Sequence, residues 1–143
     1  MTAGILGSIH SPADVHALSS QQLRDLCLEI RSTLLNYGRK HGGHIGSNLG
    51  VVELTVALHR VFGSPRDRFV FDVSHQSYVH KMLTGRAEAY LDESRFGEVT
   101  GFTNPDESAV SSCYAVYWLL LMRFFHRARY NSGLPCLVAV SYT

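Results

Sequence analysis

Apolar side chains recur at helical spacing in the first third of the chain. One face of a predicted helix carries Leu23, Leu26, Cys27, Ile30 and Leu34. Ser19 begins this helix, because Ser19 and Gln22 have the spacing of a capping box. The pattern ends near Tyr37-Gly38, and residues 1–18 are interpreted as a loose N-terminal arm.

A second amphipathic pattern predicts a helix from Val51 to Phe62, which Ser64-Pro65 ends. Its expected buried face consists of Val51, Leu54, Thr55, Leu58 and Phe62. Between the two helices, residues 42–50 carry four glycines. Glycine permits positive φ and close approach of the backbone to another group, so this segment is predicted to be a loop.

The stretch Phe69–Val73 is aromatic and β-branched, which is typical of a buried strand in a parallel sheet. A short helix is expected to follow through Leu83, with Gly85 at its C-cap, and Arg86–Leu91 is expected to be helical. In the last third, 112–130 is predicted as an apolar helix and 136–141 as a strand.

This order of elements predicts an α/β fold, in which helices surround a few parallel strands. Ligands bind such folds where loops leave the carboxyl ends of the strands. The loop that begins at Ser74 occupies a position of this kind, directly after the predicted strand. Chemistry is therefore expected near residues 74–77.

Composition and charge exclude several classes of protein. The chain has 143 residues, 45% of them hydrophobic, and a formal charge of +1, which suits one globular domain and gives no field for nucleic acid. Three cysteines fit no zinc or redox motif, so we expect reduced thiols in a cytoplasmic protein. The N-terminus does not read as a signal peptide, and the apolar run 115–122 is shorter than a membrane span requires.

His44 lies in the glycine-rich segment and is the first candidate for chemistry. Its imidazole can donate or accept a proton, or bind a phosphate or a developing oxyanion. Ser47 and Asn48 add a hydroxyl and an amide beside it. The alternative is a flexible turn with an exposed histidine.

His75 follows the predicted strand and is the second candidate. There its imidazole would point into the crevice above the sheet, and the amides of the next helix favour an anion. The alternative is a histidine that caps the helix or fills the core.

The remaining polar residues give weaker signals. His80 and Lys81 are a third candidate, but His75 and His80 lie on different helical faces, so no side-chain metal site is predicted. The other plausible polar residues are Glu53, Asp72, Asp106 and Glu107. For Glu53, an interaction with the helix dipole is the simpler role. No Ser/His/Asp arrangement is present.

Two long blocks resemble the 1-deoxy-D-xylulose 5-phosphate synthase family of transketolase-like enzymes. The first runs from Gly43 to His59 and the second from Phe71 to Arg86, and the segment Gly101–Ser108 resembles the part that follows. The resemblance covers residues 18–108. It implies a partial thiamine-diphosphate-binding domain over 19–108, preceded by the arm 1–18.

The resemblance also implies a function. Members of the family decarboxylate pyruvate on thiamine diphosphate, with Mg²⁺, and condense the product with glyceraldehyde 3-phosphate in isoprenoid precursor biosynthesis. It assigns cofactor binding to His75 and catalysis to His44, near the reacting carbons. The intact family protein is expected to act without nucleic acid or membrane partners and to form a homodimer.

The chain departs from the family pattern after Ser108. The family's Gly-His run, its magnesium ligands and its second domain do not follow. Residues 109–143 are interpreted as a divergent tail, which a frameshift, a premature stop or a gene-model fragment would explain. The sequence therefore predicts an N-terminal fragment that is inactive alone. The alternative function is a truncated, catalytically inactive domain or a partner-binding remnant.

Overall fold

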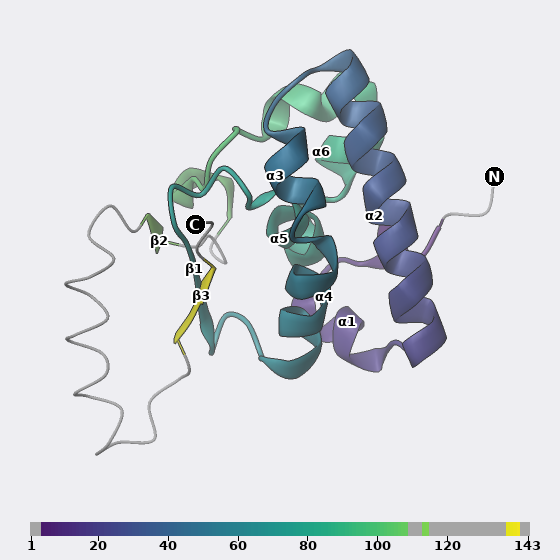
Figure 1. Ribbon diagram of the computed structural model, residues 1–143, viewed down its shortest axis with the longest axis vertical. Coiled ribbons are helices and arrows are strands. Elements are labelled where there is room, and N and C mark those ends of the chain that lie inside the picture. The colour runs from purple at the N-terminus through teal and green to yellow at the C-terminus, as the bar shows by residue number, and fades with distance from the viewer. Residues whose placement is uncertain (1–3, 109–112, 115–136, 141–143) are drawn as a thin grey trace.

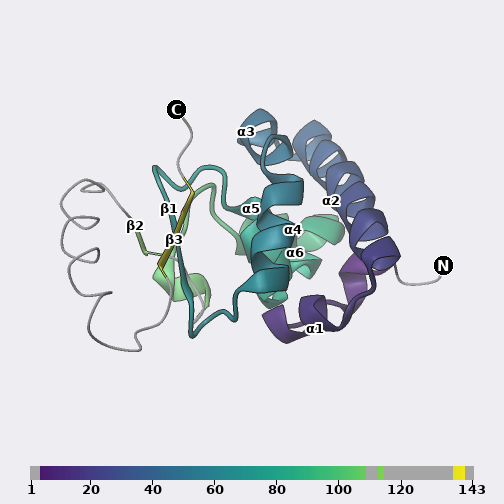
Figure 2. The same ribbon diagram turned by 60° about the horizontal axis from the view of Figure 1, so that its bottom comes forward.

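The computed structural model describes residues 4–108, 113–114 and 137–140, and within them most of the chain is helical. The longer helices pack together on one side and the strands lie on the other (Figure 1). The same separation is visible after rotation (Figure 2). The α-helices are α1 (Pro12–Ala17), α2 (Ser20–Lys40), α3 (Ile45–Leu49), α4 (Val52–Val61), α5 (Tyr78–Lys81) and α6 (Glu88–Leu91).

Shorter turns and strands complete the described chain. The 3₁₀ turns are η1 (Leu6–Ser8), η3 (Glu93–Glu98) and η4 (Pro105–Glu107), and η2 (Met82–Arg86) is a wide turn that follows α5. The strands are β1 (Arg68–Phe71), β2 (Cys113–Tyr114) and β3 (Leu137–Val140). β1 lies between the other two and pairs with each in parallel, Val70 opposite Cys113 and opposite Ala139.

Helix α2 begins as its sequence predicts and ends later. Ser19 and Gln22 form the capping box, with Gln22 N donating to Ser19 Oγ at 3.3 Å. The helix continues past Gly38 to Lys40, so the end predicted near Tyr37-Gly38 is wrong. Gly38 instead admits a neighbour, because a Cβ there would lie 2.5 Å from Ile45 Cγ1.

The core confirms the predicted face of α2 and corrects that of α4. Leu26, Ile30 and Leu34 are buried as expected. On α4 the helix is rotated from the expected face: Leu54 is 49% exposed, whereas His59 is completely buried. The apolar pattern alone missed this rotation because a histidine occupies a core position.

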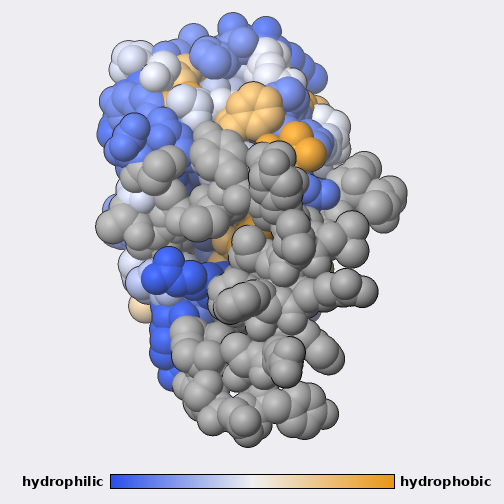
Figure 3. All heavy atoms as spheres, turned by 90° about the vertical axis from the view of Figure 1, so that its left-hand side faces the viewer, coloured by the Kyte–Doolittle hydropathy of each residue, from blue (hydrophilic) through white to orange (hydrophobic). Residues whose placement is uncertain are grey.

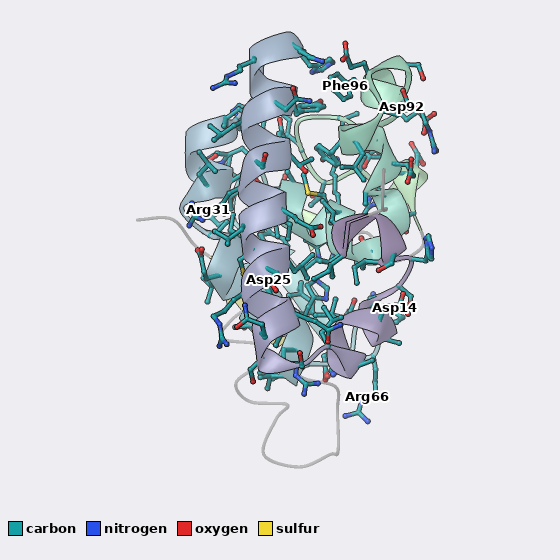
Figure 4. The ribbon with its side chains drawn as sticks, turned by 90° about the vertical axis from the view of Figure 1, so that its right-hand side faces the viewer. Asp14, Asp25, Arg31, Arg66, Asp92 and Phe96 are labelled. Carbon is teal, nitrogen blue, oxygen red and sulfur yellow. The ribbon has the colours of Figure 1, made fainter. Side chains whose placement is uncertain are left out.

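In the segment expected to be a loose arm, the described residues 4–18 pack against the helices. Leu6, Ile9 and Val15 belong to the main hydrophobic core, and Asp14 completes a capping box at the start of α1. Figure 4 shows Asp14 on α1, on the right-hand side of the molecule. Burial of these apolar side chains fixes the segment against the helices.

Two further predictions are corrected. Residues 45–49 of the predicted glycine-rich loop form helix α3, and within 42–50 only Gly42 and Gly43 have a positive φ. Most of the helix predicted over 112–130 lies outside the described residues, and its described part is strand β2. The predicted strand 136–141 contains β3. Within the described part of the chain, none of the helices combines the length and the apolar character that crossing a membrane requires.

Candidate active site

His44 stands at the start of α3, where two glycines turn the chain. Gly42 and Gly43 have φ of 86° and 106°, which only glycine adopts without strain. A Cβ on Gly43 would lie 2.8 Å from Tyr78 Oη, and the His44 backbone N–H donates to the same oxygen at 3.3 Å. The turn therefore brings His44 close to α5 while its side chain stays exposed.

His75 follows β1 after an unusual turn. Val73 and Ser74 have φ of 58° and 69°, and a β-branched residue rarely takes this left-handed conformation. Such backbone strain persists where the surroundings hold it, often at functional sites. Ser74 is buried, and its Oγ accepts a hydrogen bond from Thr103 N at 3.1 Å.

The structure brings the two predicted histidines together. The ring centroids of His44 and His75 are 5.4 Å apart, and the ring planes meet at 72°. Nδ1 of His75 is buried and has no hydrogen-bond partner among the described residues. A buried ring nitrogen of this kind is a ready contact for a ligand. The roles assigned to the two residues stay predictions.

Asn48 ties the two histidine segments together. Its side chain is completely buried, and Nδ2 donates to the carbonyl oxygens of His44, at 2.7 Å, and His75, at 2.8 Å. Oδ1 accepts from Tyr78 N at 2.8 Å. Because one end donates twice and the other accepts, the amide has only one orientation that satisfies all three bonds.

An aromatic residue and a glycine enclose His44 from the other side. The Phe102 ring lies 5.2 Å from the His44 ring, and a Cβ on Gly101 would lie 3.5 Å from His44 Cδ2. Phe102 is 41% exposed. Figure 3 views the molecule from the side of the strands, and among its coloured residues a small apolar patch lies between hydrophilic ones.

Sequence reasoning named Asn48 but missed Tyr78, Gly101 and Phe102. Asn48 follows His44 by four residues, so its place on the same helical face was a usable signal. Phe102 comes from a separate segment, and no local spacing connects it to His44.

Below the histidines lies a cluster of buried aromatic rings. Tyr37 contacts Tyr78, Tyr90 and Phe96 at centroid distances of 6.0, 5.0 and 4.7 Å. Figure 4 shows Phe96 near the carboxyl end of α2. Burial raises the pKa of Tyr37 to about 12, so its hydroxyl stays protonated at neutral pH. These rings pack against Tyr78, which contacts the His44 backbone.

The third candidate pair, His80 and Lys81, does not join His44. His80 Nδ1 lies 2.9 Å from His59 Nε2 in the core, and His59 stacks on Phe69 at 4.6 Å. Burial lowers the pKa of His59 to about 4, so this ring is neutral at pH 7. Lys81 is buried against Glu107, with its ammonium 2.7 Å from Oε2.

Glu53, another polar candidate, has a role at the surface. Glu53 accepts two hydrogen bonds from Arg31, at 2.9 and 2.6 Å, and so joins α4 to α2. Figure 4 shows Arg31 on the left of α2, on the side of the neighbouring helices. Within residues 4–108, 113–114 and 137–140, no three His, Cys, Asp or Glu side chains are grouped to hold a metal ion.

A hollow of about 500 Å³ lies elsewhere, between the N-terminal segment and helices α2 and α6. Glu29, which lines it, already accepts hydrogen bonds from Ile5 N and Leu6 N, at 3.0 and 2.8 Å. None of the predicted site residues lines this hollow.

Comparison with known proteins decides the family. The family model described as 1-deoxy-D-xylulose-5-phosphate synthase matches residues 6–116. The chain belongs to the 1-deoxy-D-xylulose-5-phosphate synthase family. The match extends past Ser108, where the resemblance seen in the sequence ends.

Relatives bearing this name include proteins of several bacteria. The chain is 56% identical over 109 residues to the synthase of Chlamydia trachomatis serovar L2, and 56% identical over 104 residues to that of Acidobacterium capsulatum. It is 52% identical over 104 residues to the synthase of Dehalococcoides mccartyi strain BAV1. These matches cover 76%, 73% and 73% of this chain but only 17%, 17% and 16% of the relatives.

Proposed function

We propose that this chain forms part of the active site of a 1-deoxy-D-xylulose 5-phosphate synthase. Such an enzyme is a thiamine-diphosphate-dependent transferase that decarboxylates pyruvate and condenses the product with glyceraldehyde 3-phosphate, in isoprenoid precursor biosynthesis. The observation that carries the proposal is the juxtaposition of His44 and His75, with ring centroids 5.4 Å apart and backbones joined by Asn48. The family membership supports it.

The described residues fit a contact with thiamine diphosphate. His75 offers a buried ring nitrogen that lacks a partner among the described residues, next to an exposed second imidazole. When bound, the cofactor supplies the electron sink that decarboxylation requires. We propose that His75 holds the cofactor.

His44 has a different proposed role. Its exposed imidazole can hold or transfer a proton at a ring nitrogen, or donate a hydrogen bond to a developing oxyanion. The positive-φ turn at Gly43 and the hydrogen bond from Asn48 to the His44 carbonyl oxygen fix the position of the His44 backbone, from which this ring projects. Positioning of this kind lowers the entropy that the reaction must lose.

The complete enzyme is proposed to have the further properties of the family. We propose an α/β thiamine-diphosphate-binding domain over 19–108, Mg²⁺ beside the diphosphate, a cytoplasmic homodimer and no nucleic-acid or membrane partner. Because the described residues group no metal ligands, family membership alone supports the proposal of Mg²⁺.

A hybrid enzyme tests the proposal. Residues 6–108 of this chain would replace the matching part of the Chlamydia trachomatis synthase, to which the chain is 56% identical. The hybrid should form product from pyruvate and glyceraldehyde 3-phosphate. His44→Ala should lower kcat about 10²- to 10⁴-fold, and His75→Ala should weaken thiamine diphosphate binding in calorimetry. The matched control is His10→Ala, because His10 is exposed on the N-terminal segment.

The same measurements test the alternative, a catalytically inactive remnant. An active hybrid whose turnover is unchanged by His44→Ala and His75→Ala would contradict the assigned roles. For the 143-residue chain by itself, we expect no turnover and weak binding of thiamine diphosphate. Tight, magnesium-dependent binding by this chain would contradict that expectation.

A further inference from the structure

The segment from Thr100 to Glu107 forms one wall of the candidate site. Gly101 and Phe102 approach the ring of His44. Thr103 N donates to Ser74 Oγ at 3.1 Å, directly before His75. The segment therefore contacts the ring of His44 and the side chain of Ser74, the residue before His75.

One carboxylate joins the two ends of this segment. Glu107, at its end, accepts hydrogen bonds from Thr100 N and Thr100 Oγ1, each at 2.7 Å. Lys81 on α5 donates to Thr100 O at 2.7 Å and to Glu107 Oε1 at 2.8 Å. The segment is thus closed into a loop and attached to α5 at the same point.

The attachment is a buried cluster of charges. The Lys81 side chain is completely buried and that of Glu107 is 6% exposed, and Arg86 Nη1 donates to Glu107 Oε2 at 3.2 Å. Burial disfavours the charged form of Glu107, but hydrogen bonds from Lys81 and Thr100 outweigh it and hold its pKa below the ordinary value. The carboxylate is therefore ionised at neutral pH and balances one of the two cations.

Stability alone does not account for this cluster. A buried ion pair is often no more stabilising than apolar residues of the same volume, because both charges lose their hydration. What the cluster provides is geometry, since an ionised carboxylate with several donors has few alternative arrangements.

We propose that Glu107 is a positioning residue, which closes the segment Thr100–Glu107 over His44 and so sets the place of that ring through Phe102. The part of this inference that concerns catalysis rests on the proposed function. The part that concerns the position of His44 does not, because it is a statement about the folded chain.

Nuclear magnetic resonance of the 143-residue chain tests the position of His44. The wild type should show a nuclear Overhauser contact between the His44 and Phe102 rings, and between the His59 and Phe69 rings. Glu107→Gln should abolish the first and retain the second. The matched control is Glu98→Gln, because Glu98 is exposed and pairs with Arg95 at 2.9 Å outside the site. It should retain both contacts.

The outcomes are decisive in both directions. Loss of the His44–Phe102 contact in Glu107→Gln alone supports the proposal. Its retention, or its absence from the wild type, overturns the proposal. If Glu107→Gln also loses the His59–Phe69 contact, the double variant Lys81→Met/Glu107→Gln replaces it, because it leaves no unpaired buried ammonium. The same loss or retention then decides.

The hybrid enzyme separates this inference from the proposed function. Glu107→Gln should lower kcat about 10²-fold, the size expected for a misplaced catalytic group, and should shift the pH profile of kcat, with KM changed little. Unchanged kcat and pH profile in an active hybrid would overturn the catalytic part. An inactive hybrid in which the chain still shows the ring contacts would count against the proposed function and leave the positioning intact.

Discussion

Two histidine pairs join the same two stretches of chain, and they differ in depth. His44 and His59 lie on the stretch of α3 and α4, and each meets a histidine of the stretch that follows β1. The rings of His44 and His75 meet near the surface, with their centroids 5.4 Å apart. His59 and His80 are buried, with 2.9 Å between Nε2 and Nδ1.

The two pairs differ in burial, and burial sets the charge and the hydrogen bonding of a histidine ring. In the core, burial keeps His59 neutral, and its nitrogen is used in a hydrogen bond with His80. Near the surface, His44 is exposed and His75 is partly exposed, so both rings lie where a ligand could approach them. The deep pair is therefore expected to control folding stability, and the outer pair to control chemistry.

The largest expected effect is on the deep pair. His59→Ala removes a completely buried ring that stacks on Phe69, and it removes the hydrogen bond to His80. The free energy of unfolding should fall by about 3–5 kcal/mol, as for other buried aromatic truncations. Urea denaturation measures it. His59→Phe keeps the ring and should lose less, and an equal loss in both variants would contradict the packing argument.

The next effect is a dependence of stability on pH. The pKa of His59 is lowered from 6.5 to about 4 in the folded chain, chiefly by burial and also by His16. As the pH falls, the unfolded chain binds this proton first. The free energy of unfolding therefore keeps its full value above pH 6.5, as far as His59 is concerned. It falls by about 3 kcal/mol as the pH is lowered toward about 4.

This pH dependence is measured as a difference between variants. Urea denaturation between neutral and acid pH should show a steeper loss of stability in the wild type than in His59→Phe. The groups that face His59 include His80, which its ring contacts, and His16, whose charge also lowers the pKa of His59. Parallel curves for the two proteins would show that the buried ring does not titrate as inferred.

A smaller effect is expected at the link between the two stretches. Asn48→Ala removes the side-chain partner of the His75 carbonyl oxygen and of Tyr78 N–H, and it removes one of the hydrogen bonds that the His44 carbonyl oxygen accepts. Leaving buried polar groups unsatisfied should cost about 1–3 kcal/mol. Asn36→Ala is the matched control, because Asn36 is exposed on α2. Equal stabilities of the two variants would mean that the link is dispensable.

The smallest effect on stability is expected at the outer pair. His44→Ala should change the free energy of unfolding by no more than about 0.5 kcal/mol, since exposed substitutions rarely do more. It nevertheless should abolish most activity in the hybrid enzyme. A loss of stability comparable to that of His59→Ala would remove the distinction between the two pairs.

The sequence by itself determined the local features of this protein. The capping box at Ser19 and the buried face of α2 follow from short-range rules, and they were predicted correctly. The strand predicted over Phe69–Val73 is present as β1, Arg68–Phe71, and it ends before Val73, whose φ is positive. The family was also readable, because its two blocks are long and ordered. Gly85 was predicted at a helix C-cap, and it lies with a φ of 89° at a non-helical kink inside η2.

Only the tertiary structure decided what depends on distant parts of the chain. His59 on α4 is buried because its ring contacts His80 and Phe69, which come from later segments of the chain. Phe102 and Glu107 are likewise placed by contacts between distant segments. Lys81 donates to Glu107, and Thr103 N, next to Phe102, donates to Ser74 Oγ. Sequence periodicity shows which residues share a face of one helix or strand. Burial and hydrogen bonding depend on which other elements pack against that face.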